Sequence, residues 1–260
     1  YLHELKDIVS SRTVITDVGS TKGQIHKEVI ALGLEKQFIG GHPMTGSEKS
    51  GYKNASALLL ENSYYILTPS CEGQEHQLDF LQNLISSLKP ITIISDYKTH
   101  DFATAAISHV PHLIAATLVK LVEENDTPEQ FMKLIAAGGF KDITRIAASS
   151  PDMWEQICSG NAENIITILD LYQKMLDQIK TSLVTNLSII RKIRSLSKQF
   201  ERSRKRFHPK ILSALHRHPR RSRCNCKNCN NIGKRKYQHK KHRNHPQQGT
   251  RRRNLIYCFL

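Results

Sequence analysis

The stretch that decides the fold is residues 37–51, QFIGGHPMTGSEKSG, where a short apolar run leads into a loop with four glycines and one histidine. Glycine lets the backbone turn sharply or approach another group closely, so this loop is suited to hold a ligand. The apolar run indicates the end of a buried strand, which places His42 at the carboxyl end of a sheet, where open α/β sheets bind ligands. Histidine exchanges protons near neutral pH, so we predict acid–base chemistry at His42. The alternative is a tight turn with a structural histidine.

Strands and helices alternate around this loop and then give way to helices alone. β-Branched and aromatic runs predict strands over residues 13–17, 37–39, 63–68 and 91–94. The stretches between them predict helices over residues 23–34 and 75–88. Later apolar residues recur at helical spacing over 99–124, 128–137, 151–159 and 162–186. We therefore predict an α/β, Rossmann-like, doubly wound and mostly parallel sheet, followed by an all-α domain. Long amphipathic helices of this kind often form a dimer interface, but their spacing alone does not distinguish an interface from an intramolecular core.

Charge divides the chain into a mildly acidic body and a strongly basic tail. The 260 residues carry a net charge of +15, but residues 191–260 hold 23 Lys and Arg and a single acid, which leaves −7 for residues 1–190. Only two of the six cysteines lie in the body, as is typical of a reducing compartment. The composition shows neither a signal peptide nor an apolar run long enough to cross a bilayer, so we predict a cytoplasmic protein without a membrane partner.

Five motifs in a fixed order carry a resemblance to a known family. They are DVGSTKG at residues 17–23, GGHPMTGSEKSG at 40–51, ISHVPH at 107–112, AGGFKDITRIA at 137–147 and SPDMW at 150–154. Together they resemble bacterial, NAD-dependent prephenate dehydrogenase, which oxidatively decarboxylates prephenate to 4-hydroxyphenylpyruvate in tyrosine biosynthesis. The resemblance implies NAD as cofactor, prephenate as substrate and a homodimer formed through the helical domain. Arogenate dehydrogenase, whose substrate has an amino group in place of the keto group, is the alternative.

The resemblance also implies roles for individual residues. His42 is implied to be the base or hydrogen-bond acceptor for the ring hydroxyl of the substrate. Ser20 is implied to orient His42 beside the nicotinamide, and Arg145 to clamp a substrate carboxylate. Further substrate-contacting or gating positions are Glu48, His109, His112, Gly138 and Trp154. The resemblance implies no metal site.

Purely structural interpretations of these residues compete with the functional roles. Serine is a preferred helix N-cap, so Ser20 could serve only to cap the helix that follows it. Arg145 lies three residues after Asp142, a spacing at which two side chains on one helix face form an ion pair. A histidine on a helix, such as His109 or His112, is more often structural than functional.

The sequence departs from the family pattern at its start. It contains no G-x-G-x-x-G loop, the element that holds a pyrophosphate in nucleotide-binding folds. We therefore expect that the first βαβ unit is missing, and no residue is assigned to the cofactor phosphates. We divide the chain into residues 1–96, the remainder of the nucleotide-binding domain; 97–190, the helical dimerisation domain; and 191–260, the basic tail.

Three interpretations of the basic tail compete. It could bind nucleic acid, but the spacing of Cys224, Cys226 and Cys229 fits no common zinc template and few aromatic residues accompany the charges. It could be a disordered, solvated segment. The third interpretation, which we favour, is a reading-frame error near residues 186–195. If the reading frame is shifted by one base, the codons for residues 215–248 permit an amino-acid sequence with a strand–helix–strand pattern. That sequence resembles an ACT domain, a ligand-sensing module found at the end of many bacterial prephenate dehydrogenases.

Overall fold

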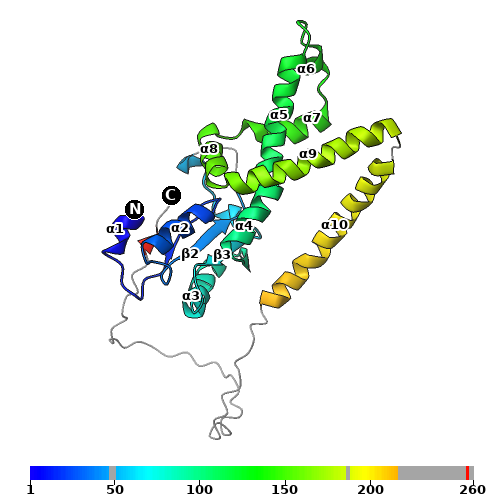
Figure 1. The fold of residues 1–260 in the computed structure, drawn as a ribbon. Helices are drawn as coiled ribbons and strands as arrows, with labels where there is room; N and C mark the ends of the chain where they lie inside the picture. The colour runs from blue at the N-terminus through cyan, green and yellow to red at the C-terminus, as the bar shows by residue number, and fades with distance from the viewer. Residues whose placement is uncertain (47–50, 186–187, 216–255, 258–260) are drawn as a thin grey trace.

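The computed structural model describes residues 1–46, 51–185, 188–215 and 256–257 (Figure 1). An α/β unit comes first, and helices follow it. The elements of the α/β unit are α1 (Leu2–Lys6), β1 (Ile15–Thr16), α2 (Gly23–Ala31), β2 (Ile39–Pro43), the 3-10 turns η1 (Tyr52–Asn54) and η2 (Ala57–Leu59), β3 (Tyr64–Pro69), α3 (Glu75–Ser86) and β4 (Ile91–Ile94). A short strand near the end of the chain, β5 (Ile256–Tyr257), lies beside β1.

The helical part begins directly after β4. It comprises α4 (Tyr97–Thr104), the π-helical segment η3 (Ala105–His109), α5 (Val110–Asn125), α6 (Phe131–Ile135), α7 (Gly138–Thr144), the 3-10 turn η4 (Arg145–Ala148), α8 (Pro151–Gly160), α9 (Ala162–Thr185) and α10 (Ser188–Leu215). The helices expected over residues 99–124, 151–159 and 162–186 are found with similar bounds, and the one expected over 128–137 is found as the shorter α6. Helices α7 and α10 were not expected, and α10 includes residues 191–215, which we had assigned to the basic tail. The order of an α/β unit and a helical unit is therefore confirmed.

Most of the described strand pairings are parallel, as expected, but one is antiparallel. β3 and β4 are parallel and β1 runs parallel to the start of β2, but β2 and β3 are antiparallel, with His42 opposite Ile66. A parallel connection normally needs a crossover helix. Between β2 and β3 the described residues form only the two 3-10 turns. The chain therefore returns in the opposite direction.

Helices cover both faces of the sheet, as a doubly wound fold requires. On one face, Ile39, Tyr65 and Leu67 pack against the apolar side of α3. Side chains alternate along a strand, so Thr68 points to the other face, where it is hydrogen-bonded to His26 of α2. Helix α4 contacts both α2 and β3 and so covers the same face as α2. A line of polar side chains is thereby buried between the sheet and these two helices.

The two glycines before His42 are needed for space and not for a turn. We had expected His42 to lie in a loop after the strand. β2 instead extends through His42 to Pro43, so the histidine lies within the strand. Neither Gly40 nor Gly41 has a positive φ. A Cβ atom on Gly41 would lie 2.5 Å from the carbonyl oxygen of Asp17, and one on Gly40 would collide with the hydroxyl of Thr68. The glycines let β2 lie directly against the buried polar layer.

We expect Gly41→Ala to destabilise the chain by about 1–3 kcal/mol, because the added methyl group would push the backbone of Asp17 away from β2. Gly46→Ala is the matched control, since Gly46 has open space around its Cβ position and no positive φ. The free energy of unfolding in urea measures both. Equal stability of the two variants would contradict the close packing of β2.

Helices α4 and α5 form one long helical stretch with a π-helical segment between them. Pro111 lacks the backbone N–H that a regular helix would use, and the wider π turn just before it relieves the clash with the preceding turn. By length and composition the stretch Tyr97–Asn125 could cross a bilayer, which corrects our expectation that no such run exists. It nevertheless carries the buried polar residues His100, Asp101 and His109, which bond to other parts of the protein.

Candidate active site

Three buried side chains form a hydrogen-bonded line that ends at His42. The Nδ1 atom of His42, on β2, lies 2.8 Å from Nε2 of His100 on α4. Nδ1 of His100 lies 2.8 Å from a carboxylate oxygen of Asp101. The remaining nitrogen of His42, Nε2, has no hydrogen-bond partner among the residues that the structure describes. The line therefore leaves one histidine nitrogen for a ligand.

Asp101 is anchored by the start of helix α2. The backbone N–H groups of Lys22 and Gly23 donate to its two carboxylate oxygens, at 2.8 Å and 2.6 Å. The first N–H groups of a helix lack intrahelical partners, and a carboxylate there is further favoured by the helix dipole. Asp101 thus takes the capping position that we considered for Ser20. The N-cap of α2 is Lys22, which has no side-chain capping bond.

A buried ion pair connects the loop after β1 with the backbone of β2. Lys22 and Asp17 are in contact, and both side chains are almost fully buried. The other carboxylate oxygen of Asp17 accepts a hydrogen bond from the N–H of Gly41 at 2.9 Å. Asp17 also accepts the N–H of Gly19 at 2.9 Å. The backbone next to His42 is thus fixed to the loop that contains Ser20.

A second polar group lies where η3 and α8 meet. The side-chain nitrogen of Asn161 donates to the main-chain oxygen of Asp101 at 2.7 Å and lies 3.2 Å from Nδ1 of His109. The rings of His112 and Trp154 are stacked, with centroids 3.5 Å apart. Nδ1 of His112 and Nε1 of Trp154 are buried without a hydrogen-bond partner among the described residues. The ring of Trp154 also makes an edge contact with the ring of His109, which connects this stack to the buried polar layer.

Burial keeps three histidines of this layer neutral. It lowers the pKa of His42 to about 3, with further lowering by the neighbouring His100 and Lys22. Burial likewise lowers the pKa of His26 and of His109 to about 4. For Asp101 burial opposes ionisation, but hydrogen bonds from His100 and from the backbone of α2 outweigh it, so that its pKa is lowered. At neutral pH the carboxylate of Asp101 is therefore an anion, and the imidazoles of His26, His42 and His109 are neutral.

These shifts predict that the chain loses stability as the pH falls. Each of these histidines has a lower pKa in the folded state than its unfolded pKa near 6.5. Its contribution to stability is complete above the unfolded pKa and is lost as the pH falls toward the folded pKa. The three histidines can give a slope of at most about 4 kcal/mol per pH unit. Urea unfolding between about pH 7.5 and pH 5 avoids most carboxyl titration and measures the slope. His26→Gln should reduce it by about one third, and a pH-independent stability would contradict the prediction.

The structure brings some of the predicted site residues together and leaves others apart. Ser20 lies half-buried in the loop after β1, at the same sheet edge as His42, but the described partner of His42 Nδ1 is His100. His112 and Trp154 are in contact. Gly138 and Arg145 are exposed, at the start of α7 and of η4, respectively. Glu48 lies outside the described residues.

Sequence reasoning missed His100 and Asp101. Both lie just after the expected strand over residues 91–94, but the five motifs do not include them. The sequence did contain a signal for them. A His-Asp pair at the start of a helix that follows a strand places an imidazole and a carboxylate near the carboxyl ends of the strands, where such sheets bind ligands. Lys22 was quoted within a motif, but its burial depends on contacts that the sequence does not show.

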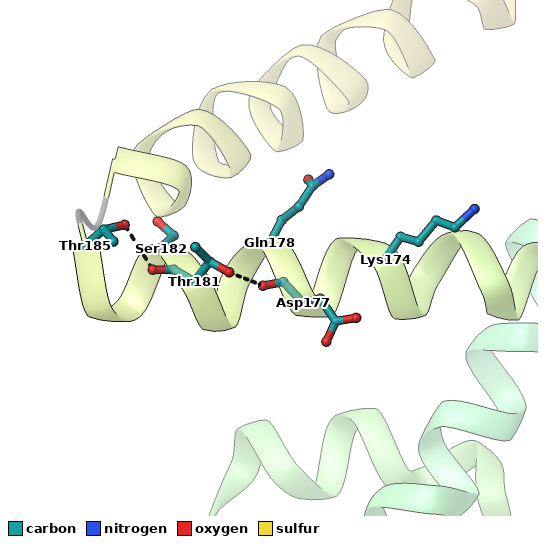
Figure 2. Close-up of a pocket in the computed structure, with 6 residues that line it drawn as sticks. All are labelled: Lys174, Asp177, Gln178, Thr181, Ser182 and Thr185. Atoms are coloured by element: carbon teal, nitrogen blue, oxygen red, sulfur yellow. Dashed lines mark hydrogen bonds between the residues drawn. The ribbon is translucent and has the colours of Figure 1, made fainter.

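An open groove of about 460 Å³ lies on α9, away from the histidines (Figure 2). It is lined by Lys174, Asp177, Gln178, Thr181, Ser182 and Thr185. The hydroxyl groups of Thr181 and Thr185 bond to the carbonyl oxygens one turn earlier in the same helix. This groove offers neither a buried acid nor an imidazole, so it does not compete with the His42 site.

Two segments near His42 differ in how well they fit a nicotinamide cofactor. The N–H groups at the start of α2 are already bonded to Asp101, so this helix does not present them to a phosphate. The half-buried loop of residues 18–21, in contrast, lies at the edge where β1 and β2 end, next to His42. Of these two segments, the loop of residues 18–21 and not the start of α2 is therefore open to a cofactor.

Two family descriptions match successive parts of the chain. Residues 1–93 match the nucleotide-binding domain of prephenate dehydrogenase, and residues 96–197 match its dimerisation domain. The chain is similar to a crystal structure of prephenate dehydrogenase from A. aeolicus in complex with hydroxyphenyl propionate and NAD+. The sequence identity is 30% and the TM-score is 0.65, and the match covers 82% of this chain and 71% of that one. The chain belongs to the prephenate dehydrogenase family.

Two other relatives define the range of the family around this chain. Prephenate dehydrogenase of Bacillus subtilis (strain 168) is 39% identical over 175 residues, which are 66% of this chain and 47% of the relative. The structure of Synechocystis arogenate dehydrogenase is 28% identical with a TM-score of 0.66, covering 79% of this chain and 73% of that one. The chain spans about half the length of the curated prephenate dehydrogenases it matches.

Proposed function

We propose that this chain provides the catalytic base and the helical domain of an NAD-dependent prephenate dehydrogenase. The observation that carries the proposal is the placement of His42 Nε2 at the sheet edge, with Nδ1 engaged by His100. His42 accepts the proton of the ring hydroxyl, and this favours departure of a hydride from the carbon that bears it. NAD, when bound, accepts that hydride. Loss of carbon dioxide from the resulting dienone then gives the aromatic ring of 4-hydroxyphenylpyruvate.

The test is reduced-nicotinamide formation by an extended enzyme, in which a strand, a G-x-G-x-x-G turn and a helix precede residue 1. We add this unit because the sequence lacks the glycine loop, and we propose that the complete protein supplies it. The two-residue strand β5 beside β1 supports this idea, since a nucleotide-binding sheet would continue at that edge. We expect turnover by the extended enzyme with NAD and much less by residues 1–260 alone. An inactive extended enzyme that is folded would contradict the proposal.

Prephenate is favoured over arogenate as the substrate. Both curated relatives at about 40% identity are prephenate dehydrogenases, whereas the arogenate dehydrogenase structure is more distant. The two substrates differ only where a keto group replaces an amino group. Assaying the extended enzyme with each substrate at equal concentration tests the choice, and a higher kcat/KM for arogenate would reverse it.

We also propose that the helical domain forms a homodimer in the cytoplasm. Apolar side chains that a soluble monomer would bury are exposed on α6, α7 and α9: Leu134 (79% exposed), Ile135, Ile143, Ile166 and Met175. Contiguous exposed apolar surface commonly marks an interface. Both described cysteines are free, as expected in a reducing compartment. Light scattering on the purified chain measures the mass, and a monomer at micromolar concentration would contradict the dimer.

The frameshift and the ACT domain also remain part of this proposal. Most of the segment that would encode the ACT domain lies outside the described residues. The dimerisation-domain match ends at residue 197, close to the position where we expect the slip. Resequencing the codons for residues 186–195 decides the matter, because an unbroken frame there would end the idea. If the frame is intact, salt-dependent retention of the chain on a polyanion column, with and without residues 191–260, tests nucleic-acid binding instead.

A further inference from the structure

We propose that His100 and Asp101 are positioning residues that fix the tautomer of His42, so that Nδ1 of His42 carries the proton and Nε2 carries the lone pair. The use of this lone pair in catalysis rests on the proposed function. The tautomer itself is a property of the folded chain and is measurable without turnover.

The argument starts at Asp101, which is held as an anion. Two backbone N–H groups, those of Lys22 and Gly23, donate to its carboxylate, and Nδ1 of His100 lies beside one of the same oxygens. An ionised carboxylate only accepts hydrogen bonds. The nitrogen of His100 that faces it, at 2.8 Å, must therefore carry a proton. His100 is only 2% exposed and Asp101 only 3%, so water offers little competition for these bonds.

The second step passes this constraint to His42. When His100 is neutral, its proton on Nδ1 leaves a lone pair on Nε2. That lone pair faces Nδ1 of His42 at 2.8 Å, a distance that requires one proton between the two nitrogens. Nδ1 of His42 must supply it, because two facing lone pairs would repel each other in a buried site. The tautomer of an imidazole is set in this way by the bond that its other nitrogen makes.

The opposite tautomer arises only if His100 is doubly protonated. Both nitrogens of His100 would then donate, and His42 would accept at Nδ1 and carry its proton on Nε2. The charged groups near this pair are Asp101, Lys22 and Asp17, and His109 also influences His42. Measurement above the ordinary histidine range, at about pH 8.5, separates the two cases because an ordinary imidazole is neutral there.

The position of Asp101 connects this line to the helical domain. Its carboxylate caps α2, and its main-chain oxygen accepts the side-chain N–H of Asn161 at the junction of α8 and α9. Gly160 at the end of α8 packs against Thr21, in the loop that contains Ser20. The orientation of His42 is thus set jointly by the α/β unit and the helical domain.

The experiment is two-bond 15N–1H correlation spectroscopy of the 260-residue chain labelled with 15N-histidine, at about pH 8.5. His42→Gln assigns the signals of His42 by their loss. We expect Nδ1 of His42 to show the shift of a protonated nitrogen and Nε2 that of an unprotonated one. The reverse pattern in the wild-type chain would overturn the proposal without the need for any variant.

Two variants test the cause. In His100→Phe nothing selects the tautomer, so we expect both tautomers of His42 to be populated. His26→Gln removes another buried histidine, one that bonds to Thr68 and Ser70 instead, and should leave the tautomer of His42 unchanged. An unchanged tautomer in folded His100→Phe would contradict the role of His100.

Kinetics of the extended enzyme then connects the tautomer to catalysis. In His100→Phe, kcat should fall in proportion to the lost population of the tautomer with its lone pair on Nε2, while KM changes little. An inactive wild-type extended enzyme with the expected tautomer would refute the proposed function alone. An active enzyme with the reverse tautomer would refute this inference alone.

Discussion

In the extended enzyme, His42→Asn is expected to lower kcat by about 10²–10⁴-fold with a much smaller change in KM. That range is the usual contribution of a positioned general base. The base accepts its proton as the hydride leaves, so its loss is felt mainly in the transition state and not in substrate binding. Asparagine retains a polar side chain of similar reach but has no basic nitrogen. The measurement is the initial rate of reduced-nicotinamide formation over a range of prephenate concentrations.

The control for this variant is His76→Asn, since His76 is exposed on α3, a helix that packs on the opposite face of the sheet from α2 and α4. It should retain normal kcat and KM. Thermal melting of both variants shows whether His42→Asn remains folded, which matters because His42 is buried. A folded His42→Asn enzyme with normal kcat would remove His42 from the mechanism.

The order of elements could be predicted because it depends on local pattern. β-Branched and aromatic runs and stretches of helical spacing were both present, and most of the expected helices begin and end close to the expected residues, although α1, α7 and α10 were not expected. The direction of β2 could not be predicted in the same way. It depends on the segment between β2 and β3, whose described turns are too short for a crossover. Strand direction is a property of the connection and not of the strand.

The candidate site shows a similar limit. His42 was predictable because two glycines precede it and leave a signal in the sequence. The reason for those glycines was not, since they let β2 approach the main-chain oxygen of Asp17 and the hydroxyl of Thr68, which come from two other segments. His100 lies 58 positions from His42 and becomes its partner only because α4 packs on the same face as α2. A pair of this kind leaves no periodic pattern to detect.

Ser20 and Arg145 illustrate the same point for roles taken from family resemblance. Ser20 lies at the expected edge, and the described hydrogen-bond partner of Nδ1 of His42 is His100. Arg145 is exposed on η4, which packs against α5. The exposed apolar residues of α6 and α7 come shortly before it in sequence. We therefore expect that substrate, a second subunit or both cover Arg145 in the working enzyme.

The clamp role predicts a kinetic signature for Arg145→Ala in the extended enzyme. Truncating one partner of a desolvated charge pair typically costs about 2–5 kcal/mol, which corresponds to about 30-fold or more in affinity. The clamp holds the carboxylate both before and during hydride transfer, so KM should rise strongly and kcat should fall less. Arg145→Lys should restore only part of the loss, because lysine provides the charge without the two-pronged geometry.

The rival role of Arg145, an ion pair with Asp142, predicts a different pattern. Both side chains are exposed, and an exposed ion pair contributes at most about 1 kcal/mol. If that pair were the whole function of Arg145, Arg145→Ala and Asp142→Ala would lower the melting temperature alike and slightly, and KM would stay normal in both. Melting temperature and KM of the two variants separate the roles. A raised KM confined to Arg145→Ala identifies the clamp, because Asp142 carries the wrong charge to bind a carboxylate, and a normal KM in both variants refutes it.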